Sequence, residues 1–144
     1  MIVWRCENKK GEGPYHSVPD SVTEYILWHG VPENAPTTHK MFYHHCKSRD
    51  EKGKALHPDI HNDELSPPSD DYLCGFDCSK KAGRWFRGYI KKLTIEGFYL
   101  RAYNVPDDKV IIGKSGKQIM FDKTAAVLID IEWSNRHVAS NSSR

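Results

Sequence analysis

Histidine and cysteine side chains, the usual protein ligands of zinc, occur in two closely spaced pairs. His57 and His61 are separated by three residues, and so are Cys74 and Cys78. Structural zinc sites use such ligands at comparable spacings, so these four residues form a candidate zinc site. The alternative is that the cysteines are small buried side chains, as free cysteine commonly is. The sequence leaves both interpretations open, and the favoured prediction includes no metal.

Arg5, Tyr15 and His16 have side chains that suit a nucleotide. Arg5 lies near the end of an expected strand. Its planar guanidinium could hold a phosphate through two hydrogen bonds, or it could form an ordinary surface pair with Glu7. Tyr15 and His16 follow a Gly-Pro turn, where they could stack on a base or hydrogen-bond to it. These residues predict a nucleotide site near the N-terminus.

Basic residues recur at helical spacing in the second half of the chain. Their intervals of four, three and four predict one basic helix face made of Lys80, Arg84, Arg87 and Lys91. Such a face could contact the phosphates of a nucleic acid, and Trp85 beside it could contact a protein. Every amphipathic helix also needs a solvated face, so nucleic-acid binding is the less favoured alternative.

The composition limits the kind of protein that positions these residues. With 144 residues, 38% apolar and 28% charged, the chain matches one ordinary globular domain. Its net charge of +2 is too small to attract nucleic acid or a membrane through the overall field. No apolar run is long enough to span a membrane, and no secretory signal is recognisable. We expect a cytoplasmic protein whose cysteines are thiols or metal ligands rather than disulfides.

The N-terminal half predicts a strand, a helix and a long loop. Residues 1–6 are rich in strand formers. Ser21 and Glu24 have the spacing of a capping box, and Gly30 can end the helix that they begin. The residues expected on the buried side of this helix are Val22, Tyr25, Ile26 and Trp28.

Residues 31–70 are rich in proline and histidine and predict little regular structure. Residues 40–45 could form a strand or a helical turn. A loop of this length is unusual in a compact domain, so it covers a substrate, is ordered by a metal, or contains elements that the pattern does not reveal. His57-Pro-Asp59 and Asp63 are the candidates for a substrate-covering loop.

The C-terminal half has clearer periodicity. A buried strand is expected over 71–76, followed by a helix from Asp77 or Ser79 to Glu96. Apolar residues at spacings of three and four define the buried face of this helix, namely Ala82, Phe86, Tyr89, Ile90 and Leu93. Tight turns then separate expected strands at 98–105, 109–112, 118–121 and 126–133, with Val127, Ile129, Ile131 and Trp133 on one face of the last.

These elements predict an α+β fold, mostly an antiparallel sheet of short strands with two main helices, because tight turns join antiparallel neighbours. The expected organisation is a single domain over 1–133 with a flexible tail over 134–144.

Three pieces of the chain resemble the ADP-ribosyltransferase superfamily, a fold that uses NAD. They are the opening strand with Arg5 and the following Gly13-Pro-Tyr-His16, the strand Tyr72-Leu-Cys-Gly-Phe76 that runs into a helix, and the late strand Gln118-Ile-Met-Phe121. The sequence also resembles small uncharacterised proteins of phages and prophages, which share such an opening and ending.

The resemblance implies an ADP-ribosyltransferase-like fold that binds NAD or another nucleotide. Arg5, Tyr15, His16, Tyr72 and Phe76 would hold the cofactor, with Tyr72 and Phe76 as a wall beside the nicotinamide; ordinary core packing is the alternative for these two aromatic residues. As an enzyme, the protein would transfer ADP-ribose to a macromolecule.

Gln118 stands where the resemblance places a catalytic glutamate. ADP-ribosyl transfer passes through an oxocarbenium-like centre, as glycoside hydrolysis does, and a neutral amide stabilises its positive charge less well than a carboxylate. Asp122, Glu96 or an acid within 50–64 would have to help. The alternative is a non-catalytic phage protein that inhibits or sequesters a host protein or nucleotide.

Overall fold

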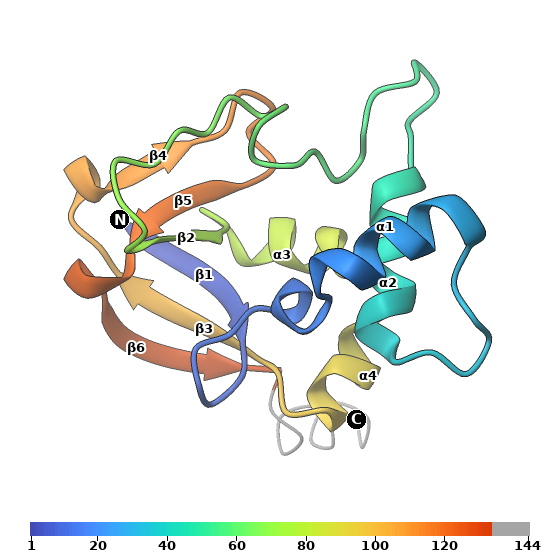
Figure 1. The fold of residues 1–144 in the computed structure, drawn as a ribbon. Coiled ribbons are helices and arrows are strands. Elements are labelled where there is room, and N and C mark those ends of the chain that lie inside the picture. The colour runs from blue at the N-terminus through green and yellow to red at the C-terminus, as the bar shows by residue number, and fades with distance from the viewer. Residues whose placement is uncertain (134–144) are drawn as a thin grey trace.

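Strands from both ends of the chain form two antiparallel three-stranded sheets. The computed structural model describes residues 1–133. One sheet has the order β1-β3-β6 and the other the order β2-β5-β4 (Figure 1). The strands are β1 (Ile2–Glu7), β2 (Tyr72–Gly75), β3 (Tyr99–Asn104), β4 (Val110–Ile112), β5 (Ile119–Asp122) and β6 (Val127–Glu132). Every strand pair is antiparallel, which confirms the expected class of sheet.

A single antiparallel bridge joins the two sheets. Trp4 and Phe76 each donate a backbone N–H to the other's carbonyl at 2.7 Å. The six strands therefore follow the order β4-β5-β2-β1-β3-β6. The approach is close because Gly75 has no side chain: a Cβ atom there would lie 2.8 Å from the carbonyl oxygen of Trp4. We call this junction the Trp4–Phe76 seam.

Gly75→Ala is expected to lower the free energy of unfolding by about 1–3 kcal/mol, as overpacking in a filled core does. The added methyl group would meet both the Trp4 carbonyl and the ring of Phe121. Urea denaturation of the two proteins measures the difference. Gly83→Ala is the matched control: it lies in a helix with open space at its Cβ position, so it should stabilise the protein by about 0.5–1 kcal/mol. Equal stability of Gly75→Ala and the parent would contradict the tight seam.

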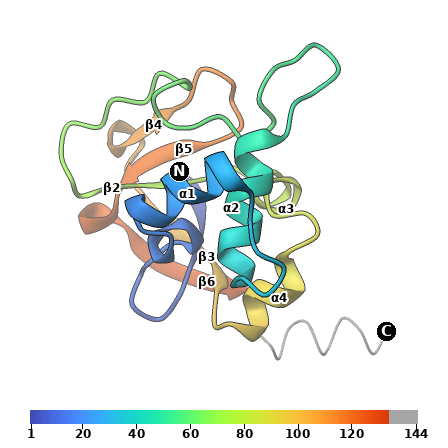
Figure 2. The same cartoon turned by 45° about the vertical axis from the view of Figure 1, so that its right-hand side comes forward.

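Four helices occur in the described part of the chain, rather than the two main ones expected. They are α1 (Asp20–His29), α2 (Thr37–Lys47), α3 (Ser79–Trp85) and α4 (Ile90–Ile95). Short 3-10 turns occur at Pro14–Ser17, Asp107–Lys109 and Lys123–Ala125. The helices lie beyond one end of the strands, with α1 next to α2 in both views (Figures 1 and 2). None of the helices within residues 1–133 has the length and apolar character needed to cross a membrane.

The start expected for α1, with Ser21 as its N-cap, was two residues too late. The helix begins at Asp20 after Pro19, without a side-chain cap, so Ser21 and Glu24 form no capping box. Its expected end is confirmed, because Gly30 adopts a positive φ of 81°. Its buried side was also overestimated: of its residues only Ile26 is buried, whereas Trp28 is 81% exposed, because α1 lies on the outside of α2.

The helix expected over 79–96 is interrupted. Gly88 has a φ of 88°, in a region where a right-handed helix cannot continue, and the chain turns there before α4 begins. The break separates Lys80 from Lys91, so no continuous basic face exists. The apolar positions were nevertheless correct, because one core cluster contains Ala82, Phe86 and Leu93, with Tyr89 and Ile90 packed against it.

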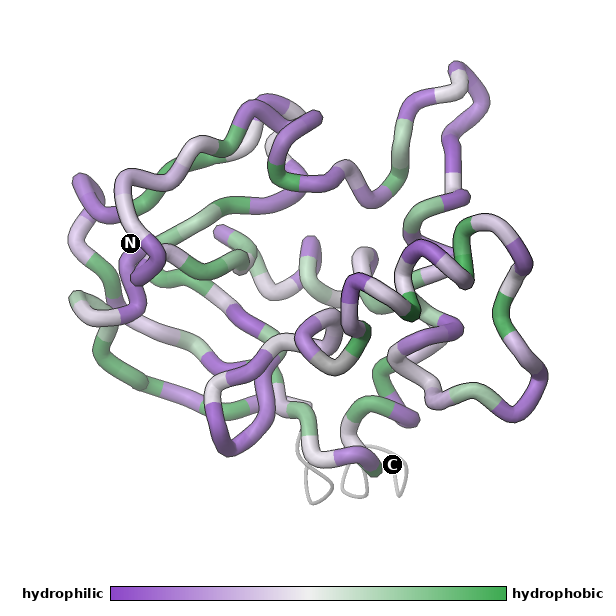
Figure 3. Tube along the Cα trace, viewed as in Figure 1, coloured by the Kyte–Doolittle hydropathy of each residue, from purple (hydrophilic) through white to green (hydrophobic). Residues whose placement is uncertain are grey.

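The core follows the two sheets. The largest cluster joins α2, α3 and α4 to β1, β3 and the residue after β2, and it includes Met41, Phe76, Trp85 and Leu100. Two smaller clusters are centred on Phe121 and on Met120. β6 confirms the strand expected over 126–133. It lies at the edge of its sheet, and its hydrophobic run (Figure 3) includes Val127 and Ile129, which are 64% and 52% exposed. The predicted tail, residues 134–144, lies outside the described residues.

Candidate functional site

All six residues singled out for a nucleotide site line one cavity of about 700 Å³, which we call the Arg5 cavity. They are Arg5, Tyr15, His16, Tyr72, Phe76 and Gln118. Although these positions are spread over most of the sequence, four structural features bring them together: the end of β1, the turn Pro14–Ser17, the strand β2 and the residue that precedes β5. The structure shows this convergence, whereas what the cavity binds stays a prediction.

Arg5 is held firmly at the floor of this cavity. Its Nε donates to Glu7 at 2.8 Å, Nη1 donates to the Cys74 carbonyl at 2.8 Å and Nη2 donates to the Gly11 carbonyl at 3.1 Å. The pair with Glu7 considered from the sequence therefore exists, but it is buried rather than on the surface, since Arg5 is 8% exposed. A guanidinium has five N–H groups, so two remain beyond these three bonds.

Glu7 is the centre of a buried charge network. Its carboxylate is fully buried and accepts hydrogen bonds from Arg5, Arg101, Lys123 and the Tyr103 hydroxyl. Burial alone would raise the pKa of Glu7, but the Tyr103 hydroxyl and the Lys123 and Arg5 charges outweigh it and lower that pKa below 4.5. The network itself thus contains one carboxylate and three cations.

Tyr15 belongs to a ring cluster with His45, His57 and Trp85. Its hydroxyl accepts the Trp85 indole N–H at 2.9 Å and bonds to Nδ1 of His45. His45 stacks on His57 with ring centroids 3.7 Å apart. Burial, with the neighbouring His57 and His44, lowers the pKa of His45 to about 3, and burial raises the pKa of the Tyr15 phenol. Both groups are therefore neutral at neutral pH.

The other predicted residues differ in how strongly they are fixed. Tyr72 and Phe76 line the cavity and also belong to core clusters, so the two alternatives weighed for them coexist. His16 is largely exposed, and its Nε2 lies 2.7 Å from a carboxylate oxygen of Glu12. The lining therefore combines packed aromatic surface with an exposed polar pair.

Gln118 does not present its amide nitrogen to the cavity. Its Nε2 donates to the Pro58 carbonyl at 2.6 Å and to the Asp63 carboxylate at 3.1 Å. Asp63 is itself buried and accepts two further hydrogen bonds from Ser115. The side chain of Gln118 thus fastens the loop 58–63 against the start of β5, and the amide carbonyl is the part not engaged in these two bonds.

The long central segment contributes more than the sequence indicated. It contains α2, which supplies Phe42, His45 and Cys46 to the Arg5 cavity. Its loop supplies His57, Pro58 and Asp59 to the same cavity, where the sequence suggested a substrate-covering loop. The buried positions Thr38, Met41 and His45 have the three- and four-residue spacing of a helix face, which is the signal that could have revealed α2.

Two chemical alternatives from the sequence can be compared with this geometry. Within the described chain, no group of three or more histidine, cysteine or acidic side chains could hold a metal ion, and the four cysteines are free thiols. Of the acids named as catalytic helpers, Asp122 and Glu96 do not line the Arg5 cavity, whereas Asp59, an acid within 50–64, does, as does Glu12. Asp122 instead accepts the backbone N–H of Thr124.

The fold and site define an α+β protein in which two antiparallel sheets and a set of short helices surround a ligand-sized cavity. The chain belongs to the family described as Bacteriophage T4 Y00F protein, which it matches over residues 1–135.

A relative in Enterobacteria phage T4, the uncharacterized 19.7 kDa protein in the motB-dexA intergenic region, is 52% identical over 46 residues. The aligned stretch covers 31% of this chain and only 26% of that relative. No solved structure matches the chain. The expected similarity to small phage proteins is confirmed.

Proposed function

We propose that the protein binds NAD or a related nucleotide in the Arg5 cavity, as an ADP-ribosyltransferase-like protein that captures its ligand without efficient transfer. The observation that carries this proposal is the convergence of three separate sequence pieces on one cavity. Those pieces are the strand with Arg5 and the turn after it, the strand Tyr72–Gly75, and the residue before β5.

The floor of the cavity suits phosphate groups. Gly11 and Gly13 line it, and Gly13 lies so close to the Arg5 guanidinium that a Cβ there would be 3.4 Å from Nη2. A backbone without side chains lets a phosphate approach closely. Arg5, and Lys123 close to Gly11, supply positive charge near these glycines, whereas Glu12 and Asp59 are the carboxylates of the cavity lining.

Aromatic residues of the same cavity suit a base or a nicotinamide ring. Phe42, Tyr72 and Phe76 line it, and aromatic faces bind flat heterocycles by stacking. Its volume of about 700 Å³ lies within the range of about 300–1,000 Å³ usual for small-molecule sites. A dinucleotide contains both phosphate groups and flat rings. One such ligand could therefore use the glycines near Arg5 and the aromatic residues of the same cavity.

The chemistry at position 118 favours capture over transfer. Gln118 is neutral, and both N–H groups of its amide are engaged with Pro58 and Asp63. Glu12 accepts a hydrogen bond from Asn8 and lies 2.7 Å from Nε2 of His16, and Asp59 accepts hydrogen bonds from Asn62. Both carboxylates of the lining are therefore already engaged, and neither stands at position 118, where the resemblance places the acid that stabilises an oxocarbenium-like centre. A protein of this kind would sequester a nucleotide or inhibit a host factor.

Phe42→Ala is expected to weaken NAD binding about tenfold or more, because base stacking on an aromatic ring contributes about 1–3 kcal/mol. Calorimetric titration with NAD measures the affinity, and an assay of the titrated mixture for free nicotinamide measures turnover. We expect binding with no release above the rate of the buffer. Tyr25→Ala is the matched control, because Tyr25 is an exposed aromatic on α1 that does not line the cavity.

Three results would change the proposal. Multiple turnovers of nicotinamide release would make the protein an enzyme and overturn capture without transfer. Equal affinity of the Phe42→Ala and parent proteins for NAD would show that the nucleotide does not bind in this cavity. Absence of binding at millimolar NAD would overturn the proposal altogether.

A further inference from the structure

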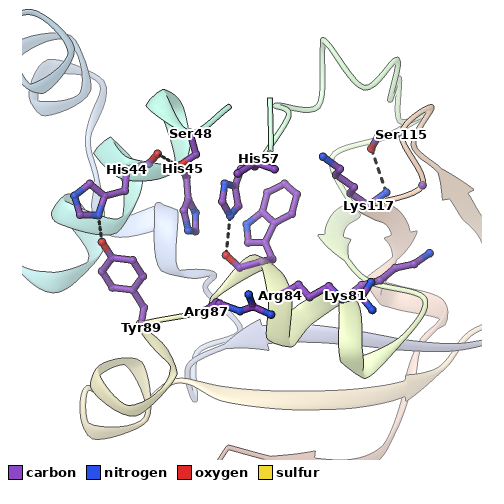
Figure 4. A pocket seen from close by; sticks show the side chains of 13 residues that line it. His44, His45, Ser48, His57, Lys81, Arg84, Arg87, Tyr89, Ser115 and Lys117 are labelled. Carbon is purple, nitrogen blue, oxygen red and sulfur yellow. Dashed lines mark hydrogen bonds between the residues drawn. The ribbon is translucent and has the colours of Figure 1, made fainter. Parts of the chain in front are cut away.

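A second cavity, of about 790 Å³, shares three lining residues with the Arg5 cavity, namely His45, His57 and Trp85. It opens between the C-terminal part of α2, the helix α3 and the turn from β4 to β5 (Figure 4). We call it the basic cavity, after Lys81, Arg84, Arg87 and Lys117, which line it. The proposed nucleotide function makes no use of these four side chains.

The charges of the basic cavity are unbalanced. No aspartate or glutamate is among the lining residues within 1–133. Lys81 is paired with Asp77 at 2.8 Å, and Lys117 donates to the Ala55 carbonyl at 3.0 Å. Arg84 and Arg87 are exposed and form no ion pair with the described residues. Two guanidinium groups are therefore available to an anionic ligand, and Figure 4 shows them along the same side of the cavity.

The same cavity offers ring and apolar surface. Tyr89 is half-buried at its edge, and its hydroxyl bonds to Nδ1 of His44, which fixes the ring (Figure 4). Leu56, 42% exposed, lies in the lining as well. The guanidinium group of arginine can bind two phosphate oxygens through two parallel hydrogen bonds. A fixed aromatic ring provides a stacking surface for a base.

We propose that the basic cavity binds single-stranded nucleic acid, with Arg84 and Arg87 on backbone phosphates and Tyr89 against a base. This proposal does not rest on NAD binding in the Arg5 cavity. The combination of cations and ring favours a nucleic acid over an acidic peptide, which needs only the cations. A concave site favours a flexible single strand over the rigid rod of a duplex, whose bases are stacked inside it.

Binding is tested by fluorescence anisotropy with a labelled oligothymidylate of about 15 nucleotides, in the absence of NAD. Affinity should fall as salt rises, with a logarithmic slope of about −0.7 per phosphate contact. The double variant Arg84→Gln/Arg87→Gln should lose at least tenfold in affinity at low salt, and its slope should be smaller by about 1.4. Tyr89→Leu should weaken binding at every salt concentration without changing the slope.

Lys91→Gln/Lys92→Gln is the matched control, because it removes two exposed cations of α4 that do not line the basic cavity. This control should bind as the parent does. Equal losses in the two double variants would reduce the interaction to a nonspecific charge effect and overturn the proposal, as would absence of binding at low salt. Tighter binding of a duplex, or displacement of the oligonucleotide by polyglutamate at equal charge, would assign the cavity to a different partner.

Discussion

Glu7→Gln is expected to lower the free energy of unfolding by about 3–5 kcal/mol, the usual cost of removing one partner from a buried ionic network. The carboxylate is fully buried and binds Arg5, Arg101 and Lys123. A glutamine has almost the same shape, but it leaves three cations without their counter-charge and directs an amide N–H group toward them. Chemical denaturation at neutral pH measures the difference.

The effect should depend on pH in a defined direction. The pKa of Glu7 is lowered below 4.5 by the Tyr103 hydroxyl and the cations, against the opposing effect of burial. The stabilisation by this carboxylate is therefore fully present above pH 4.5 and is lost as the pH falls through its lowered pKa. The gap between the parent and Glu7→Gln should narrow over that acidic range. The pKa of His45 also differs between the folded and unfolded states. This difference is the same in both proteins and cancels from the gap between them.

Glu96→Gln provides the control for Glu7→Gln, because Glu96 is exposed at the end of α4. Changes of exposed charges usually alter stability by about 0.5 kcal/mol or less. A stability of Glu7→Gln within that same range, or a gap to the parent that widens on acidification, would show that the network does not hold the base of the Arg5 cavity.

Gln118→Glu is expected to destabilise the protein by about 3 kcal/mol or more at neutral pH, since it places a charge among buried acceptors. The new carboxyl would face the Asp63 carboxylate and the Pro58 carbonyl, both of which now accept the Gln118 amide. Two adjacent carboxylates cannot both ionise easily, so the folded state would raise the pKa of the pair. The variant should therefore lose stability as pH rises above about 4.3, opposite to the trend for Glu7.

Gln118→Met separates the two causes of this loss. It removes the donor without adding a charge, so it should cost only about 1–2 kcal/mol and show the pH dependence of the parent. Neither variant should release nicotinamide from NAD. Release by Gln118→Glu in a stable protein would mean that the new carboxylate turns into the Arg5 cavity, and it would strengthen the ADP-ribosyltransferase resemblance considerably.

The sequence was informative where one local pattern dominates. Alternating apolar residues and tight turns located β3, β4, β5 and β6 within a few residues, and the three-and-four spacing identified the buried face around Phe86. Periodicity reports which side of a segment is apolar. It does not report a single residue of positive φ, so the break at Gly88 between α3 and α4 could not be read from it.

Other features depended on contacts between distant residues. The hydrogen bonds of Gln118 reach partners 60 and 55 positions away, and no local pattern predicts such partners. α2 was obscured because its polar and histidine-rich sequence has a narrow apolar face, and its start after Pro36 looks like loop sequence. The resemblance did select residues that line one cavity. It could not show that Gln118, at the position expected for a catalytic acid, instead hydrogen-bonds to Pro58 and Asp63 and holds their loop in place.

The Trp4–Phe76 seam has a consequence for the motions of the protein. β1 and β3 are joined along six residue pairs and β2 and β5 along four, whereas one backbone bridge and the hydrogen bond from Arg5 to the Cys74 carbonyl join β1 to the segment of β2. Breaking so few bonds costs less than global unfolding, so the amide hydrogens of Trp4 and Phe76 should exchange through a partial opening. The Arg5 cavity has residues of both β1 and β2 in its lining. A ligand that contacts both strands closes this opening by mass action, so the exchange rate of two backbone amides reports whether the cavity is filled.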